Sequence, residues 1–131
     1  MNLDKKIKIL IIDDEELICW SLKKIFEKEE YSVNCAHTGD DALRKLNENR
    51  YDIVITDLKL PDVRGLEIVK KIKEMAVDTV VIVMSSYFPE PVVDDVMKHG
   101  VFRCVNKPFE INDIISDVKD AMEIKEKGAI G

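Results

Sequence analysis

Long apolar runs, cysteines and excess positive charge are all scarce in this sequence of 131 residues. No apolar run approaches the roughly 20 residues that a membrane-spanning helix needs. The start MNLDKKIKILII leads into a strand-like segment rather than into a cleavable signal. The formal net charge of −6 argues against direct nucleic-acid binding by this domain. We therefore expect a cytoplasmic protein that binds neither nucleic acid nor a membrane.

The few cysteines are Cys19, Cys35 and Cys104, an odd number with no CxxC motif among them. This spacing argues against a disulfide framework and against a zinc site built on cysteine pairs. All three lie in apolar stretches of sequence, which favours buried free thiols in a reducing compartment.

Two kinds of segment alternate along the rest of the chain. Short runs rich in Ile and Val predict strands covered on both faces, and the stretches between them carry apolar residues at helical spacing. We predict strands near 7–12, 32–36, 52–56, 79–84 and 101–105. The predicted helices span 16–29, begin at Gly39, begin at Gly65, lie between Pro89 and Gly100, and span 111–125. Thr38 is the expected N-cap of the second helix, and Asn112 that of the fifth.

The content of 46% hydrophobic and 35% charged residues describes one soluble globular domain. Alternating strands and helices predict an α/β fold with a mostly parallel sheet. Because five right-handed βα units cannot all wind to one side of an open sheet, the strand order must reverse. The predicted architecture is a flavodoxin-like (βα)5 three-layer sandwich with a parallel five-stranded sheet of order 2-1-3-4-5. The domain is assigned to residues 1–124, and residues 125–131 are predicted to form a flexible tail or linker stub.

Most of the predicted strands end on a chemically reactive residue. The run before residue 37 has no such group, whereas the others end on Asp13-Asp14, Asp57, Ser85 and Lys107-Pro108. The carboxyl ends of parallel strands meet at one edge, and the first and third strands are neighbours where the order reverses. Carboxylates, a hydroxyl and an ammonium group are therefore expected to gather there.

This set of groups predicts a particular chemistry. Neighbouring carboxylates repel one another unless positive charge intervenes, and a set of oxygen ligands favours Mg²⁺ over Zn²⁺. Lys107 supplies a second, fixed positive charge. A carboxylate such as Asp57 can form an aspartyl phosphate, and Ser85 can donate a hydrogen bond to a phosphoryl oxygen.

Four segments, in this order and spacing, resemble the response-regulator receiver domain of two-component signalling: LIIDDEE at 10–16, IVITDLKLPDVRGLE at 53–67, VIVMSS at 81–86 and VNKPF at 105–109. The resemblance runs from about residue 6 to residue 123. It implies a phosphorylation-dependent switch that catalyses only its own phosphorylation and dephosphorylation. It also implies the sheet order 2-1-3-4-5 and a cis Lys107–Pro108 peptide bond.

The resemblance assigns roles to single residues. Asp57 would accept the phosphoryl group from a sensor histidine kinase or phosphotransfer protein and would share in binding Mg²⁺. Asp14 would be a direct ligand, Asp13 a ligand through water, and the backbone carbonyl of Lys59 a further ligand. Lys107 would contact the phosphoryl group, and Ser85 would be the switch hydroxyl.

The signal would leave through the surface formed by the fourth helix, fifth strand and fifth helix, which controls an output domain or downstream protein, or forms a homodimer on phosphorylation. The chain is either a stand-alone receiver or the N-terminal domain of a transcription regulator. The pattern ICW-x-L at 18–22 is similar to receivers of the nitrogen-regulator type, which control an ATPase domain.

Two alternatives from other classes stay open. One is a degenerate receiver that acts as a constitutive protein-interaction module. The other is an aspartyl-phosphate phosphotransferase or phosphatase, although such enzymes typically carry a second Asp where Lys59 stands.

The departure from the family pattern that bears on the switch lies at Cys104. Cys104 stands three residues before Lys107, where the family usually has Tyr or Phe. Phe102 is expected on the same side of the sheet by strand alternation, so it is a candidate substitute. Trp20 lies away from the main buried stripe of the first helix, so either it packs under the fifth helix, the favoured interpretation, or it is partly exposed at a partner surface. His37 and His99 are predicted to be surface residues without a chemical role.

Overall fold

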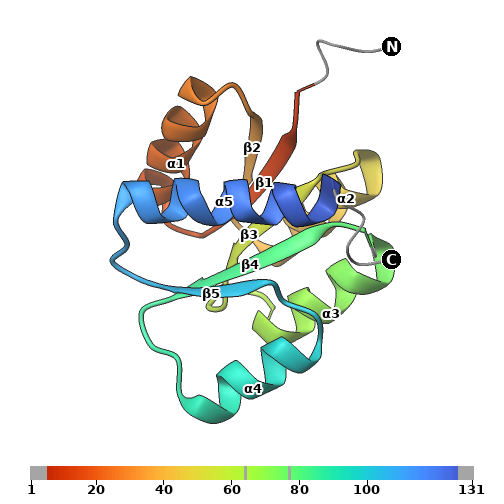
Figure 1. Ribbon diagram of the computed structural model, residues 1–131. Helices are drawn as coiled ribbons and strands as arrows, with labels where there is room; N and C mark the ends of the chain where they lie inside the picture. The colour runs from red at the N-terminus through yellow and green to blue at the C-terminus, as the bar shows by residue number, and fades with distance from the viewer. Residues whose placement is uncertain (1–5, 64, 77, 127–131) are drawn as a thin grey trace.

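The computed structural model describes residues 6–63, 65–76 and 78–126. These residues form one parallel 5-stranded sheet in the order β2-β1-β3-β4-β5, with helices on both faces (Figure 1). The predicted fold class and strand order are confirmed. Residues 1–5 of the predicted domain and 127–131 of the predicted tail lie outside the described residues, whereas residues 125 and 126 belong to the last helix.

The elements lie within about two residues of the predicted segments. The strands are β1 (Lys8–Ile12), β2 (Ser32–Ala36), β3 (Ile53–Asp57), β4 (Val80–Ser85) and β5 (Arg103–Asn106). The helices are α1 (Glu16–Lys28), α2 (Gly39–Glu48), α3 (Gly65–Met75), α4 (Glu90–Lys98) and α5 (Ile111–Glu126).

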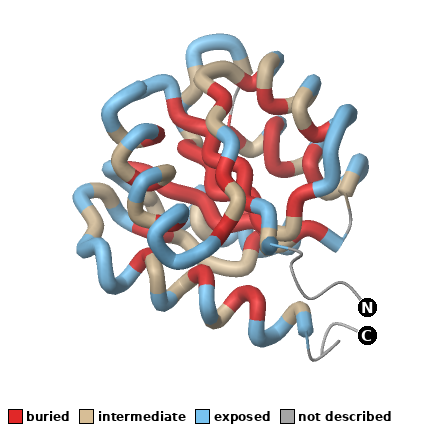
Figure 2. Tube along the Cα trace, turned by 90° about the horizontal axis from the view of Figure 1, so that it is seen from above, coloured by how far each residue is buried: buried red, intermediate tan, exposed pale blue. Residues whose placement is uncertain are grey.

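Side-chain alternation divides the core into two layers. Ile9 and Ile11 of β1 face a cluster that includes Leu22 and Phe26 of α1 and Val118 of α5. The intervening strand residues face a second cluster, to which α2, α3 and α4 contribute. Figure 2 shows the central strands buried and the outer turns exposed. Strands covered on both faces explain why their sequences show little polar alternation.

Helix termini follow local sequence signals in two cases and not in a third. The Thr38 hydroxyl accepts a hydrogen bond from the Asp41 N–H at 3.1 Å, so the predicted cap is confirmed. Gly100 follows α4 with a φ of 87°, a left-handed conformation that glycine adopts easily. The predicted Asn112 cap is wrong, because α5 begins at Ile111 and Asn112 lies inside its first turn.

The two C-terminal helices are attached to the sheet to different extents. Arg103 of β5 pairs with Asp117 at 2.7 Å and with Asp120 at 2.9 Å, both on α5. Ile114, Val118, Ala121 and Met122 of α5 are also buried. Helix α4 has a single buried residue, Val96.

None of the helices in the described part of the chain has the length and apolarity of a membrane-spanning segment.

Gly65 is required where α3 passes close to the end of β3. A Cβ at this position would lie 2.4 Å from the Leu58 carbonyl oxygen and 2.6 Å from the Leu58 Cα. Both are backbone atoms, so Gly65→Ala is expected to lower the free energy of unfolding by about 1–3 kcal/mol through overpacking. Urea denaturation measures this change. The control is Glu67→Ala, an exposed position on the same helix, with an expected change within about 0.5 kcal/mol; equal midpoints for both variants would contradict the assignment.

Candidate functional site

Two buried carboxylates lie side by side at the carboxyl edge of the sheet. The parallel register pairs Ile12 of β1 with Thr56 of β3, so the residues that follow, Asp13 and Asp57, are neighbours. Asp13 is fully buried and Asp57 is 6% exposed. With the exposed Asp14, they form a group in which one carboxylate oxygen from each residue lies within 4.8 Å of the other two. The structure thus brings together the three aspartates that the sequence singled out.

Lys107 lies between the two buried carboxylates. Its Nζ donates hydrogen bonds of 2.7 Å to Asp13 Oδ2 and of 2.7 Å to Asp57 Oδ2. Burial alone would lower the pKa of Lys107, but the hydrogen bonds to both carboxylates outweigh it and the pKa is raised. The ammonium group therefore keeps its charge at neutral pH. The Lys107–Pro108 peptide bond is cis, as predicted.

One lysine does not balance the negative charge of this cluster. Burial raises the pKa of Asp13, and the hydrogen bonds from Lys107 and from the Glu15 N–H at 2.9 Å offset this only in part. The remaining excess of negative charge favours a divalent cation. Three carboxylates with no nitrogen or sulfur ligand in the group fit Mg²⁺.

Backbone amides hold the loop that follows Asp57. The Lys59 N–H donates to Asp57 Oδ1 at 2.9 Å, and the Leu58 N–H donates to the Met84 carbonyl at 3.0 Å. Asp57 is therefore oriented by Lys107 on one oxygen and by the main chain on the other. This arrangement leaves the Lys59 backbone next to the acidic cluster.

Asp62 anchors the far end of the same loop to the N-terminus of α2. Its Oδ2 accepts a hydrogen bond from the Asp40 N–H at 3.0 Å, and its Oδ1 accepts one from the Gly39 N–H at 2.8 Å. These two amides hold the pKa of Asp62 below its usual value. Sequence reasoning missed this contact, because no pattern at residue 62 indicates a helix 22 residues earlier.

Ser85 is buried at the end of β4, next to the acidic cluster in sheet order. Its hydroxyl donates to the Tyr87 carbonyl at 2.9 Å and accepts from the Tyr87 N–H at 3.2 Å. The Lys107 N–H donates to the Ser85 carbonyl at 2.8 Å. Ser85 is thus joined through the main chain to the residue that contacts Asp57. The Tyr87 side chain itself is 70% exposed.

Phe102 does not take the place of the missing aromatic residue. It packs against the cluster under α1 and α5, whereas Cys104 packs against the cluster under α2, α3 and α4. The predicted common side is wrong, because β5 begins at Arg103 and strand alternation does not extend back to Phe102. The Phe102 ring instead lies under the Arg103 guanidinium, whose Cζ is 4.7 Å from the ring centroid.

Three further predictions about single side chains need correction. Trp20 is 59% exposed rather than packed under α5, because it lies on the helix face opposite the buried stripe. Cys19 is buried, but Cys35 and Cys104 are only half-buried; all three are free thiols. His37 is half-buried, with Nδ1 3.0 Å from the Asp13 carbonyl oxygen, so it adjoins the site.

The family model described as "Response regulator receiver domain" matches residues 9–119. Among curated proteins, the chain is 34% identical to the sporulation initiation phosphotransferase F of Bacillus subtilis, covering 90% of this chain and 95% of that protein. It is 26% identical to the DNA-binding transcriptional regulator NtrC of Proteus hauseri, covering 90% of this chain but 25% of that protein. The chain thus spans nearly all of one relative and a quarter of another, and the predicted nitrogen-regulator type stays a prediction.

Solved structures agree with this match. A CheY-like response regulator receiver domain protein from Methanospirillum hungatei JF-1 has a TM-score of 0.92 at 27% identity, covering 95% of this chain and 99% of that one. A response regulator receiver domain protein from Clostridium thermocellum has a TM-score of 0.85 at 31% identity, covering 92% and 97%.

The raised pKa of Asp13 predicts how the stability of the metal-free protein depends on pH. A carboxyl group whose pKa is higher in the folded state contributes stability below about pH 4, its unfolded pKa, and this contribution is lost as the pH rises through the folded pKa. We therefore expect Asp13→Asn to be more stable than the wild type at pH 7 without divalent cations, and the difference to shrink on acidification. Urea denaturation with a chelator at both pH values measures this.

The control for this experiment is Asp14→Asn, which removes an exposed carboxylate of the same cluster. We expect a smaller gain in stability from this variant, since its carboxylate is already solvated. An Asp13→Asn variant no more stable than the wild type at pH 7 would show that burial of the Asp13 charge carries no cost.

Proposed function

Because the chain belongs to the response regulator receiver domain family, we propose that it is a signalling switch phosphorylated on Asp57 in the presence of Mg²⁺. The phosphoryl donor is a sensor histidine kinase or a phosphotransfer protein. The observation that carries this proposal is the position of Lys107, hydrogen-bonded to Asp13 and Asp57 within a cluster of three carboxylates. This arrangement supports a cationic centre at which phosphoryl oxygens are stabilised.

Each residue of the site has a separate role in the proposed phosphoryl transfer. A carboxylate oxygen of Asp57 forms the bond to phosphorus as the bond to the donor's histidine nitrogen breaks. Asp14, Asp57 and the Lys59 carbonyl would hold Mg²⁺ directly and Asp13 would hold it through water. When bound, the ion neutralises charge on the phosphoryl oxygens. Lys107 keeps its charge in the buried site, which suits it to contact one of these oxygens.

Ser85 is proposed to carry the signal away from Asp57. To donate to a phosphoryl oxygen, its hydroxyl must leave the Tyr87 carbonyl, which it contacts at 2.9 Å. This exchange would shift the loop between β4 and α4 and favour a second packing of the α4–β5–α5 surface. Since Cys104 replaces the usual aromatic residue, no ring swing accompanies the shift. The exposed side chains of Met97 and Ile111, 45% and 52% exposed, give this surface apolar contact area for an output domain, a downstream protein or a second copy.

The phosphoryl donor is proposed to dock on the surface near α1. Leu17 and Trp20 of α1 are 72% and 59% exposed, unusually high for large apolar side chains. A kinase or phosphotransfer protein docked there would bring its phosphohistidine toward Asp57. These partners imply a cytoplasmic location, and no substrate other than the protein itself.

A second candidate function is a phosphoryl relay, in which Asp57 passes the group on to another histidine. It is favoured by the similarity to a protein named as a phosphotransferase, whose length this chain spans almost completely. The degenerate-receiver alternative is disfavoured by the intact set of Asp13, Asp14, Asp57 and Lys107.

The first prediction of this proposal concerns the acceptor. Incubation with acetyl phosphate and Mg²⁺ is expected to add one phosphoryl group to the wild type, measured as a mass increase, and none to Asp57→Ala or to protein treated with EDTA. Asp52→Asn is a matched control, because Asp52 precedes the same strand at its opposite end and pairs with Lys125 at 3.2 Å. Label retained in Asp57→Ala would refute the assignment.

The second prediction concerns the lifetime of the phosphorylated state. Tyr87 lies two residues beyond Ser85, and its ring is proposed to hinder the water that attacks phospho-Asp57. Tyr87→Ala is expected to lose the phosphoryl group faster than the wild type, and Tyr87→Phe, which keeps the ring, to lose it at the wild-type rate. Hydrolysis followed after removal of the phosphodonor measures both, and an unchanged rate in Tyr87→Ala discards the idea.

A further inference from the structure

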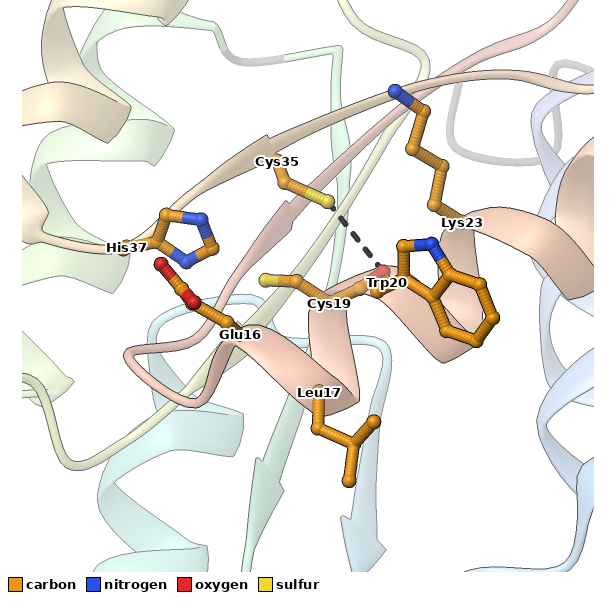
Figure 3. Close-up of a pocket in the computed structure, with 7 residues that line it drawn as sticks. All are labelled: Glu16, Leu17, Cys19, Trp20, Lys23, Cys35 and His37. Atoms are coloured by element: carbon orange, nitrogen blue, oxygen red, sulfur yellow. Dashed lines mark hydrogen bonds between the residues drawn. The ribbon is translucent and has the colours of Figure 1, made fainter.

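A cavity of about 540 Å³ lies between α1 and the edge strand β2. Trp20 and Lys23 line it from α1, and Cys35 and His37 line it from β2 and the residues after it (Figure 3). The phosphoryl chemistry proposed for Asp57 uses none of these four side chains. Donor docking at Leu17 and Trp20 accounts for the outer rim of the cavity but not for the two cysteines that line it.

Two thiols meet at the wall of this cavity. Cys35 Sγ donates to the Cys19 carbonyl at 3.5 Å, and both residues line the cavity. Figure 3 shows both sulfur atoms in the space between α1 and β2. Cys19 is 1% exposed, whereas Cys35 is half-buried and reaches the cavity. A small reagent that enters the cavity therefore reaches Cys35 more easily than Cys19, although both residues line it.

The surroundings of Cys35 favour its thiolate. The Cys19 side chain, Lys23 and His37 lower the pKa of Cys35 to about 7, whereas burial and Glu27 oppose this shift. The hydrogen bond that Cys35 donates to the Cys19 carbonyl is made only by the thiol form and must be given up on ionisation. Cys104 gives an internal comparison, because burial raises its pKa and no cation offsets the effect. The chain thus carries one activated thiol and one inert thiol of similar exposure.

We propose that Cys35 is an oxidisable thiol that reacts with hydrogen peroxide or a small organic hydroperoxide and then closes a reversible disulfide with Cys19. In the first step the Cys35 sulfur forms a bond to oxygen as the O–O bond breaks. The displaced oxygen takes the thiol proton and leaves as water or alcohol.

In the second step the Cys19 sulfur attacks the sulfenic acid at Cys35. The S–S bond forms, the S–O bond breaks, and the hydroxyl group leaves as water with the Cys19 proton. The two thiols together lose two electrons, and the hydroperoxide gains them. A cellular dithiol reverses the reaction by thiol–disulfide exchange. In a reducing compartment the Cys19–Cys35 disulfide would be transient, as in a redox sensor, rather than a permanent structural disulfide.

The bridge would join α1 covalently to β2 and change one contact of the acidic site. Cys19 Sγ donates to the Asp13 carbonyl at 3.4 Å in the thiol form, and a disulfide has no proton to donate. This link does not depend on phosphorylation, so the proposal stands or falls separately from the function of Asp57.

The test uses the whole chain and its own cysteines. The reduced wild type is alkylated with limiting iodoacetamide at pH 7, and the modified peptides are quantified by mass spectrometry. Cys35 is expected to react about tenfold faster than Cys104, because half of a thiol of pKa near 7 is ionised against a few per cent of an ordinary one. Equal rates at the two positions would overturn the proposal.

A second measurement identifies the oxidation product. After treatment with hydrogen peroxide, a non-reducing digest is expected to contain a Cys19–Cys35 linked peptide that disappears with dithiothreitol. Cys104→Ser should retain it as the matched control, and Cys35→Ser should lose it. In Cys19→Ser, dimedone should trap the sulfenic acid at Cys35. Absence of the linked peptide from the oxidised wild type, or its persistence after dithiothreitol, would refute the reversible bridge.

Discussion

The hydrogen bonds from Lys107 to Asp13 and Asp57 are the contacts on which the whole site depends. They allow two carboxylates to be buried side by side at the ends of adjacent strands, where repulsion would otherwise separate them. The same residue is joined through its backbone to Ser85 of β4. The ends of β1, β3 and β4 are thus held in one place by a residue that follows β5, and the order of the sheet makes this possible.

Lys107 alone does not balance the negative charge of the three aspartates in the site. Asp13 shows it most directly, since burial raises its pKa despite a 2.7 Å contact with the ammonium group. This excess of negative charge fits a divalent cation at the group formed by Asp13, Asp14 and Asp57. Asp62 adds a second constraint, because it attaches the loop after Asp57 to two amides at the start of α2. Asp57 and the loop that follows it are therefore held in place by the protein's own hydrogen bonds.

Strand periodicity and strand ends made most of the fold and the acidic site predictable from sequence. Runs of Ile and Val mark strands covered on both faces, and the residues that follow them must meet at one edge of a parallel sheet. Asp13, Asp57 and Lys107 could be found in this way. Asp62 and His37 could not, because their contacts join distant segments and follow no periodic pattern. Phe102 was misplaced by applying strand alternation one residue too early. For Trp20, helical spacing placed the side chain away from the buried stripe but could not decide between packing under α5 and exposure, and the structure shows it exposed.

The unequal attachment of the last two helices has a consequence for where the domain can open locally. Helix α5 buries four residues and is tied to Arg103 by two ion pairs, so displacing it exposes much apolar surface and breaks charged contacts. Helix α4 buries only Val96. Because it buries less apolar surface, its hydrogen bonds are expected to open at a smaller free-energy cost than those of α5. Local opening is therefore expected to begin at α4, next to the loop that follows Ser85, before it reaches α5.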